Sequence, residues 1–572
     1  MSVVRRFSIG ALLPAATLTS LVAATATTSG PTPAAEGRMA SESRVPDDPC
    51  QRAWSPAPEL HRDIERIMDI WSKPGRRVEA SSDGGLGRPA PASADPKNGS
   101  DERPNVLLFM VDDMRADELS GPWMRQTRSL IQDPGVTFAN SFSPLPLCGP
   151  ARASFLTGRY AHNTGIRMNK VPSSAFDQLD DDNTLPVWLD NAGYNTAFLG
   201  KYINGYAPQT AQKPGSYVPP GWDQWYGSIG GGTYNYFHTV LSNNGKGTID
   251  LDGKYQTNAY AEMGSRMVSE LARKDAPFYF NLSFTAPHAG TPRDKDPGAL
   301  KSPVSAPKMR GAYDKLISTP AGVPGEPCND GLSSAVQSKK PITPKRQRKI
   351  TEVRRQRAES LASVDDAIAR IMRSLRKSGE LDNTYVIFTS DNGYFLGEFR
   401  QAIGKKLQYE PSLRTPTIMR GPGIDRGITR DRAFTTIDFA PTIADMAGAT
   451  VGPNVDGTSL LNTATGKPQP WLRPILTDTG AWRDRRHYGL GVLMPGTFYG
   501  EYNDPRRPRE LFDLRRDPSE LHNLIDSPRY RGESRKMSTL LDQLRQCRGA
   551  ECRWPLGQST GGHQSGSTRQ GT

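Results

Sequence analysis

Three apolar runs in this sequence each end in side chains that can bind a cation or transfer a proton. Continuous apolar runs of this length are typical of strands buried on both faces. Chemistry in doubly wound sheets gathers at the carboxyl ends of the strands, so the polar residues that follow the runs are expected to lie together. The runs are 105–111, followed by Asp112 and Asp113; 278–284, which leads to His288; and 384–390, followed by Asp391 and Asn392.

The paired oxygen donors after the first and third runs predict a metal site. Carboxylate and amide oxygens are the ligands that Ca²⁺ or Mg²⁺ prefers. Adjacent acids that point at one place repel each other unless a cation or a proton intervenes, which favours a bound metal. A purely structural alternative stays open, in which Asp112 caps the next helix and 391–393 form only a turn.

The segment 144–159 carries a candidate nucleophile. Pro150 suits the first turn of a helix, and Cys148 lies just before it, where free backbone N–H groups attract an anion. Arg152, one turn further on, can offer a forked pair of donors to a tetrahedral oxyanion. For an isolated cysteine of a secreted protein, half of a disulfide would be the usual interpretation, and the surroundings of Cys148 argue against it.

This segment resembles the signature of the sulfatase family, whose CxPxR pattern appears as Cys148, Pro150 and Arg152. The resemblance extends over residues 104 to 524 in a series of ordered motifs, and a chance match to all of them in order is improbable. The further motifs are Leu156 to Arg159, Gly193 to Tyr202, Asp112-Asp113, Pro287-His288, Asp391-Asn392-Gly393, Gly404-Lys405 with Tyr409-Glu410, and the C-terminal stretch 510–524.

The resemblance implies a covalent mechanism at Cys148. In sulfatases the motif cysteine is oxidised by a formylglycine-generating enzyme, and the hydrated aldehyde attacks sulfur. The second hydroxyl of the hydrate then allows sulfate to leave without attack of water on sulfur. Ca²⁺, with Mg²⁺ as an alternative, would be bound by the modified Cys148 and by Asp112, Asp113, Asp391 and Asn392.

The resemblance also assigns the charged residues around the sulfate. Arg152, Lys201 and Lys405 match positions that neutralise the aldehyde hydrate and the sulfate oxygens, and His288 matches the general acid for the leaving alcohol. Many sulfatases carry a histidine two residues after the motif lysine, but this chain has Ile203 there. We consider His162 as its replacement, because it follows the predicted nucleophile helix.

Two further features concern the branch of the family and the cysteines. The segment Lys201-Tyr202-Ile203-Asn204 together with His162 is similar to the branch of glucosamine-6-sulfatases, arylsulfatases and extracellular sulfatases. Assigning Cys148 to formylglycine leaves four cysteines, an even number compatible with disulfides. The pairs that we hypothesise are Cys547 with Cys552 and Cys50 with Cys328.

The elements that must position these residues follow from the alternation of patterns. Helical stripes over 260–271 and 361–375 precede two of the apolar runs, which predicts an α/β fold with a large mixed, mostly parallel sheet between helices. The resemblance makes this fold alkaline-phosphatase-like. We expect a catalytic domain over 104–450, a surface excursion over 301–350, a smaller C-terminal α+β subdomain over 451–552 and a disordered tail over 553–572.

The N-terminal region predicts export. Residues 1–30 place Arg5 and Arg6 ahead of an apolar stretch that ends among small residues, which is typical of a signal peptide and too short for a stable membrane span. Residues 31–103 are rich in Pro, Ala, Ser and Gly and read as a linker with one docked helix at 58–73. The expected location is extracellular, or else periplasmic or associated with a cell wall.

Composition limits the classes of function. The 572 residues include 72 Lys and Arg against 60 Asp and Glu, a formal net charge of +12, with 36% hydrophobic residues. This balance excludes a polytopic membrane protein and a wholly disordered chain, and it favours acidic partners. Nucleic acid is not an expected partner, because Lys and Arg form no compact cluster with interleaved aromatic residues.

Three functions therefore compete. The first is a secreted sulfatase acting on aryl sulfates or sulfated sugars, with loops such as 205–255 selecting the alcohol. The second is a phosphonate monoester or phosphodiester hydrolase, because relatives in the alkaline phosphatase superfamily share the metal acids. The third is a catalytically silent glycan-binding protein with an unmodified Cys148, against which the intact metal acids argue.

Overall fold

The structure is a computed structural model, and it describes residues 102–170, 175–206, 216–291, 300–322, 331–481, 484–506 and 509–553. These residues all belong to one compact unit, which spans Pro49–Thr572. The predicted signal peptide, nearly all of the predicted linker with its helix, the tail beyond Arg553, and Cys50 and Cys328 lie outside the described residues.

An eight-stranded sheet forms the centre of the unit, with the strand order β11-β2-β10-β9-β1-β8-β4-β5. Pairing is parallel from β9 through to β5 and between β11 and β2, whereas β10 is antiparallel to both of its neighbours. The predicted mixed, mostly parallel sheet is therefore confirmed. Its strands are β1 (Asn105–Val111), β2 (Val136–Phe138), β4 (Asn195–Gly200), β5 (Gln224–Gly227), β8 (Phe278–Ser283), β9 (Thr384–Ser390), β10 (Thr417–Arg420) and β11 (Ile428–Arg430).

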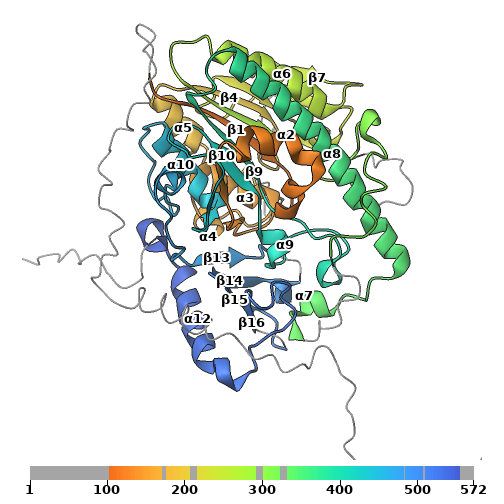
Figure 1. Ribbon diagram of the computed structural model, residues 1–572. Helices are drawn as coiled ribbons and strands as arrows, with labels where there is room; N and C mark the ends of the chain where they lie inside the picture. Colours follow the sequence, from red (N-terminus) through yellow and green to blue (C-terminus); the bar gives the residue numbers. More distant parts are fainter. Residues whose placement is uncertain are drawn as a thin grey trace, which may run out of the picture. The chain divides into compact units, whose positions relative to one another are not determined.

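Helices cover both faces of this sheet, and the sequence of β1 shows why. Leu107 and Phe109 pack into one apolar cluster with α6 and α8, whereas Val106 and Leu108 pack into another with α3, α5 and α10. Successive side chains of a strand point to opposite faces, so an unbroken apolar run fits a strand between two helical layers. Figure 1 shows α6 lying along α8 on one side, and α5 with α10 on the other. These covering helices are α3 (Cys148–Thr157), α5 (Leu185–Asn191), α6 (Gln256–Leu271), α8 (Pro344–Lys377) and α10 (Phe439–Met446), and the short α4 (Ala161–Thr164) follows α3 along the chain.

Helix α8 is longer than its sequence pattern indicated. It has 34 residues and begins at Pro344, inside the stretch 301–350 that we expected to be a surface excursion. Thr343 caps it by accepting a hydrogen bond from the backbone N–H of Arg346, and Pro344 takes the first helical position, where its missing N–H costs nothing. Ile350 and Val353 then anchor this part of the helix in a small apolar cluster of their own.

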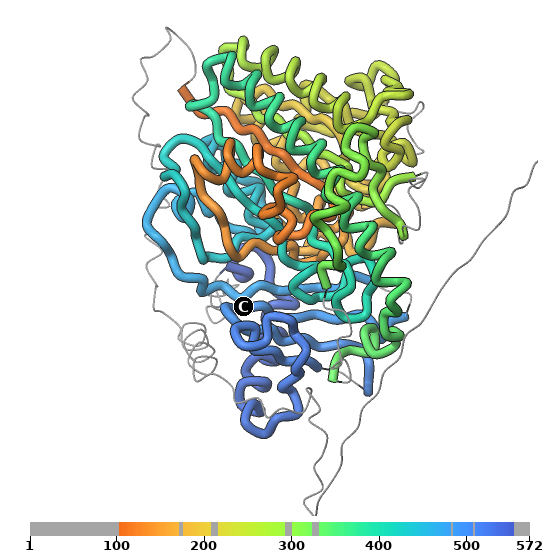
Figure 2. Tube along the Cα trace, turned by 45° about the vertical axis from the view of Figure 1, so that its right-hand side comes forward, coloured from red at the N-terminus to blue at the C-terminus, as the bar shows by residue number. Residues whose placement is uncertain are grey.

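A second, antiparallel sheet forms the predicted C-terminal subdomain. Its four strands are β13 (Ile475–Asp478), β14 (Gly489–Met494), β15 (Thr497–Tyr502) and β16 (Arg509–Asp513), paired in chain order. Helix α12 (Arg531–Leu544) packs on this sheet through Met537, Leu540 and Leu541. Figures 1 and 2 both show this sheet and α12 below the central sheet. The disulfide between Cys547 and Cys552 is present, as hypothesised.

Candidate active site

Three buried acids meet where β1 and β9 end. The parallel register places Val111 beside Ser390, so Asp112 and Asp391 leave the sheet side by side. The backbone N–H of Asp113 donates to Asp391 Oδ1 at 3.1 Å. Carboxylate oxygens of all three acids lie within 4.8 Å of one another, and each acid is buried. The structure thus brings together the residues predicted from two strand ends 278 residues apart.

Cys148 is the first residue of α3 and points at these acids. Its Sγ lies 3.2 Å from Asp112 Oδ1 and 2.7 Å from Lys405 Nζ, and the residue is 1% exposed. Asn169 Oδ1 accepts a hydrogen bond from the N–H of Gly149 at 2.9 Å and so holds the start of the helix. Among the described cysteines, Cys148 is free.

Arg152 lies one helical turn after Cys148 and is almost fully fixed by its neighbours. Its Nε donates to Asp391 Oδ2 at 2.8 Å, and its Nη1 donates to Ser283 Oγ and to the carbonyl of Lys201, each at 2.7 Å. Its Nη2 is buried without a hydrogen-bond partner among the described residues. A buried guanidinium nitrogen without a partner is costly, so this donor is suited to an anionic ligand.

Lys201 enters the site directly from β4. Its Nζ contacts Asp112 Oδ2, and it lies 5.1 Å from the centre of the Tyr234 ring. The turn into Lys201 requires the preceding Gly200, which has φ +108°. A Cβ at that position would lie 2.1 Å from the carbonyl oxygen of Ser283, so no other residue fits there.

Lys405 and His288 form the side of the cluster that solvent can reach. Lys405 Nζ contacts Asp113 Oδ1 and lies 3.4 Å from Asn392 Oδ1. His288 Nε2 lies 3.8 Å from Asp113 Oδ2. The side chains of His288 and Lys405 are 24% and 12% exposed, whereas those of Lys201 and Asp112 are 3% and 0% exposed. This side of the cluster is therefore the more accessible one.

Burial and mutual charge shift the pKa values in this cluster strongly. Burial opposes the ionisation of Asp112, but the cations around it, Lys201 first, hold its pKa well below the usual range. Burial and the neighbouring Asp112 raise the pKa of Asp391. Burial, followed by Asp112, raises the pKa of the Cys148 thiol to about 12, so an unmodified Cys148 is a protonated thiol and a poor nucleophile near neutral pH.

The donor set fits a hard divalent cation and an anion together. Three carboxylates and the amide oxygen of Asn392 are oxygen ligands of the kind that Ca²⁺ or Mg²⁺ takes. Because the acids are buried and adjacent, a cation among them removes their mutual repulsion. The unpartnered Nη2 of Arg152 supplies the complementary donor for an anion.

His162 does not belong to this cluster, which corrects our expectation that it replaces the missing second histidine. It follows the C-terminal end of α3, a ten-residue helix that is about 15 Å long, whereas Cys148 begins that helix. Its Nε2 is hydrogen-bonded with the carbonyl oxygen of Cys547 at 2.8 Å, and its ring stacks on Tyr160. His162 therefore joins α4 to the C-terminal disulfide loop.

Sequence reasoning missed several residues around the cluster. Tyr234 lies against both Lys201 and His288, with 4.6 Å between its ring centre and that of His288, and it accepts a hydrogen bond from Asn204 Nδ2 at 3.0 Å. It belongs to the aromatic-rich stretch 205–255, where no periodicity singled out one position. Asn204 belongs to the Lys-Tyr-x-Asn segment quoted in the sequence analysis, where it was given no role. Its position three residues after Lys201 could have indicated that it lies beside the site.

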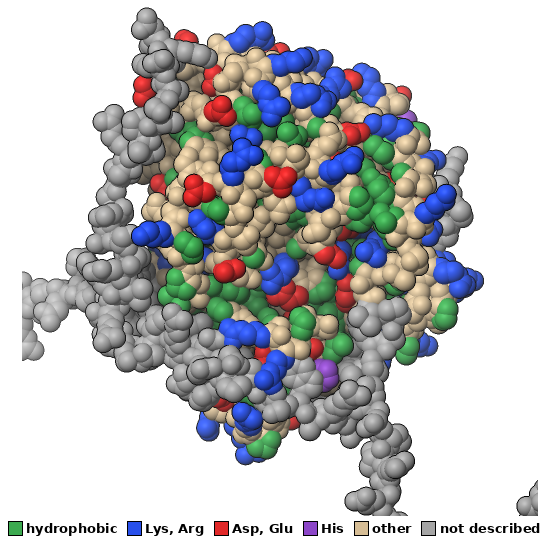
Figure 3. All heavy atoms as spheres, viewed as in Figure 1, with side chains coloured by type: hydrophobic (Ala, Val, Ile, Leu, Met, Phe, Trp, Pro, Cys, Tyr) green, Lys and Arg blue, Asp and Glu red, His purple; other side chains and the backbone are tan. Residues whose placement is uncertain are grey.

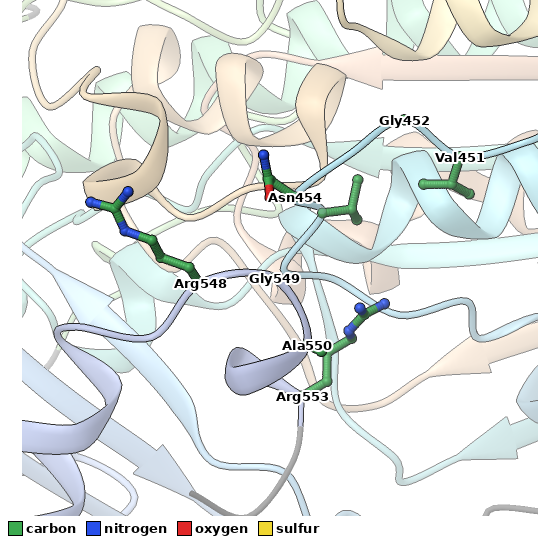
Figure 4. A pocket seen from close by; sticks show the side chains of 8 residues that line it. Val451, Gly452, Asn454, Arg548, Gly549, Ala550 and Arg553 are labelled. Carbon is green, nitrogen blue, oxygen red and sulfur yellow. The ribbon is translucent and has the colours of Figure 1, made fainter. Parts of the chain in front are cut away.

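A cavity of about 390 Å³ lies elsewhere, between 451–455 and 548–553. The guanidinium groups of Arg548 and Arg553 point away from each other at its rim, so they do not converge on one ligand (Figure 4). None of its lining residues belongs to the cluster around Cys148. This cavity therefore has no part in the chemistry of the site.

The covered, mostly parallel sheet with acids at its carboxyl edge is an alkaline-phosphatase-like α/β fold. Residues 104–449 match the family described as Sulfatase, and residues 397–547 match that described as N-sulphoglucosamine sulphohydrolase, C-terminal. The chain belongs to the sulfatase family, and it is a hydrolase of sulfate esters. Members of this family use a metal ion and formylglycine, and the buried carboxylates are groups that could hold the ion.

Curated relatives share about a third of the matched residues. N-acetylglucosamine-6-sulfatase of Capra hircus is 30% identical over 79% of this chain and 85% of its own length. An arylsulfatase of Volvox carteri is 31% identical over 79% of this chain and 76% of its own length. The extracellular sulfatase SULF-1 homolog of Drosophila melanogaster is 31% identical over 64% of this chain and 32% of its own length. Some homologues are thus extracellular sulfatases.

Solved structures share the fold at lower identity. One, in complex with its substrate D-glucosamine-2-N,6-O-disulfate, has a TM-score of 0.60 and 23% identity over 79% of this chain and 98% of its own. Phosphonate monoester hydrolase from Silicibacter pomeroyi also has a TM-score of 0.60, with 21% identity over 77% of this chain and 95% of its own. At these identities the likeness concerns the fold alone.

Lys and Arg side chains are distributed over much of the face in Figure 3, with Asp, Glu and hydrophobic side chains among them. Within the described part of the chain, no helix combines the length and apolar character needed to cross a bilayer.

Proposed function

We propose that this chain removes sulfate from sulfated amino sugars, using a formylglycine formed from Cys148 and a Ca²⁺ held by Asp112, Asp113, Asp391 and Asn392. The observation that carries this proposal is that Cys148 and a buried guanidinium nitrogen without a hydrogen-bond partner lie one helical turn apart on α3. Cys148 Sγ is 3.2 Å from Asp112 Oδ1 at the start of α3, and Arg152 Nη2, one turn later, has no partner among the described residues.

The charges of the site support a sulfate ligand. A formylglycine hydrate at position 148 would supply a hydroxyl nucleophile, and a bound Ca²⁺ would supply positive charge. The three acids are formally balanced by Arg152, Lys201 and Lys405. A divalent cation would leave a surplus of two positive charges, which favours both the singly charged sulfate ester and the doubly charged sulfate that is released from it. Arg152, Lys201 and Lys405 then neutralise the sulfate oxygens as charge moves onto them.

His288 is suited to protonate the departing alcohol. Its Nδ1 lies 2.8 Å from the carbonyl oxygen of Ala289, and because a carbonyl only accepts, Nδ1 carries a hydrogen. Its Nε2 faces the cluster on the side that solvent can reach, so a leaving oxygen can approach it there. Tyr236 fixes this turn by donating to the carbonyl of His288 at 2.7 Å. With Nδ1 protonated, Nε2 can donate to the alcohol only in the imidazolium form, which burial opposes by lowering the pKa of His288 and which the nearby Asp112 and Asp113 favour.

The names of the relatives favour an amino sugar as the alcohol. The goat relative is an N-acetylglucosamine-6-sulfatase, and the ligand in one structural neighbour is a disulfated glucosamine. The rings of Tyr234 and His288 at the entrance offer apolar faces on which a sugar can stack.

A substrate panel tests this proposal. Release of sulfate from N-acetylglucosamine-6-sulfate, from glucosamine-2-N,6-O-disulfate and from an aryl sulfate is compared with turnover of a phosphonate monoester and a phosphodiester. We expect the 6-sulfated sugars to give the highest kcat/KM. Dominant turnover of the phosphorus substrates would refute the sulfatase assignment, and a preference for the aryl sulfate would refute the amino sugar.

The modification is tested separately. Mass spectrometry of the peptide that carries Cys148, from protein produced in the native host, is expected to show an aldehyde or its hydrate. An unmodified thiol would instead support a silent glycan-binding protein, because the high pKa of this thiol leaves it protonated.

Partners and location complete the proposal. A formylglycine-generating enzyme is required for maturation, and the apolar stretch of residues 1–30 together with extracellular homologues supports export. Cell fractionation with detection of the mature N-terminus checks this, and a chain retained inside the cell with residues 1–30 attached would contradict it.

A further inference from the structure

A buried arginine from α8 reaches the two segments that carry the metal acids and the proton donor. Arg357 is 1% exposed, although it lies on the long helix that covers the sheet. Its Nη2 donates to the backbone carbonyl of Asp113 at 2.6 Å, and its Nη1 lies 3.4 Å from the carbonyl oxygen of Pro287, the residue before His288. One guanidinium group therefore bridges the chain beyond β1 and the chain beyond β8.

The guanidinium is itself held rigidly on two sides. Glu118 accepts from Nε at 2.7 Å and from Nη2 at 2.6 Å, which is the forked geometry of a strong pair. The ring of Tyr394 lies 4.6 Å from the guanidinium carbon. Glu118 is 5% exposed and also accepts from the N–H of Arg115 at 2.9 Å. Arg357 thus has a fixed orientation before any ligand binds.

Asp113 needs an outside contact of this kind. Its φ is +71°, in the left-handed region that residues other than glycine rarely adopt. Such a conformation persists only where the surroundings impose it. The bond from Arg357 to the Asp113 carbonyl, together with the bond from the Asp113 N–H to Asp391, clamps both sides of this residue. The carboxylate then points at Cys148 and Lys405.

We propose that Arg357 is a positioning residue, which sets the main chain of Asp113 for metal binding and the turn of His288 for proton transfer. This inference rests on the proposed function, because it takes Asp113 as a metal ligand and His288 as the acid. Arg357 touches neither the substrate nor the ion. A residue that orients a metal ligand commonly contributes about 10- to 100-fold to metal affinity.

The substitution Arg357→Lys separates positioning from stability. A lysine can keep the charge pair with Glu118, but its single nitrogen cannot also reach the carbonyls of Asp113 and Pro287. The matched control is Arg473→Lys, because the side chain of Arg473 is only 11% exposed and forms a fork with the buried Asp438, through contacts of 2.8 Å and 2.5 Å, away from the cluster. Both substitutions break one arginine–carboxylate fork, but only the first releases Asp113.

The primary readout is Ca²⁺ binding, measured by titration calorimetry on the full chain after chelator treatment. We expect Arg357→Lys to raise the Kd for Ca²⁺ by at least about tenfold and Arg473→Lys to leave it unchanged. At saturating Ca²⁺, Arg357→Lys is expected to lower kcat with little change in KM, because His288 is displaced while the sulfate-binding cations stay in place. Thermal unfolding in chelator gives the stability loss of each variant.

Two results would overturn the inference: a wild-type Kd for Ca²⁺ in Arg357→Lys, or equal losses of affinity in both variants. If Arg357→Lys does not fold, Glu118→Asp replaces it, since a carboxylate shorter by one methylene draws Arg357 back, and an unchanged Kd there would also overturn it. Failure of the wild-type chain itself to bind Ca²⁺ or Mg²⁺ would refute the proposed metal site, and the inference with it.

Discussion

Glu510 offers a prediction whose size can be worked out from its surroundings. This residue of β16 is 0% exposed and links three parts of the chain. It accepts hydrogen bonds from Tyr409 at 2.8 Å, from Tyr502 at 2.7 Å and from the N–H of Ser333. Burial nevertheless raises its pKa from 4.5 to about 7, because these three donors only partly replace the lost water.

The sign of the effect follows from proton binding. Between pH 4.5 and about 7 the folded chain keeps the proton on Glu510 while the unfolded chain has lost it, so stability falls as pH rises. The pKa of Glu510 differs by about 2.5 units between the folded and the unfolded chain, which at about 1.4 kcal/mol per unit corresponds to about 3 kcal/mol. Glu510→Gln removes this ionisation. The free energy of unfolding of Glu510→Gln, relative to that of the wild type, should therefore rise by about 3 kcal/mol from pH 4.5 to pH 8.

Denaturant unfolding at pH 4.5 and pH 8 measures this difference. Titrating groups that do not sense Glu510 are shared by the two proteins and cancel. Besides burial, the charge of Glu510 also raises the pKa of the buried Glu520, so its removal shifts the difference in the same direction. Any fixed cost of the amide in its hydrogen bonds is the same at both pH values. Glu270→Gln on the exposed face of α6 serves as the control, with an expected change within about 0.5 kcal/mol. A difference between Glu510→Gln and wild type that stays constant or narrows as pH rises would refute the reasoning.

Four further predictions concern the site and the C-terminal loop. Cys148→Ala should abolish sulfate release while the thermal midpoint stays near that of the wild type, and residual turnover would contradict a nucleophile at this position. Arg152→Lys removes the unpartnered Nη2, so kcat should fall by about 10²- to 10³-fold, and a change in KM alone would argue against transition-state stabilisation. Chelation should remove activity and added Ca²⁺ should restore it, whereas full activity in chelator would exclude a metal. Replacing the buried Cys547 and Cys552 by Ala opens the short loop between them and should cost about 2 kcal/mol in chemical unfolding, and an unchanged stability would show that packing holds the loop alone.

The sequence was most informative where burial is complete. The ranges predicted for β1 and β9 agree with the structure, because an apolar run between two helical layers has no other place in the fold. The acids after these strands converge, since parallel neighbours end at the same edge. Both inferences depend on local patterns that tertiary structure reinforces.

The failures have physical reasons as well. The first turns of α8 carry mostly Lys and Arg, so the apolar stripe that reveals a helix begins only near Ile350. We expected His162 in the site because it is close to Cys148 in the sequence. Helix α3 lies between the two residues, however, and His162 follows the end of α3 that is away from Cys148. Tyr234 and Arg357 reach the cluster from elements that no motif connects to it, so only the packing of α8 and of the Gly230–Tyr234 turn reveals them.

The contact between Cys148 and Lys405 can form only after much of the chain has been synthesised. The two residues lie 257 positions apart in the chain, and the ribosome therefore delivers Lys405 long after Cys148. At about 5–20 residues per second this interval is on the order of 10–50 s. During synthesis the thiol lacks the partners that enclose it in the finished protein, where it is 1% exposed. An enzyme that converts Cys148 has its widest access in that interval, before the last strand end closes the site.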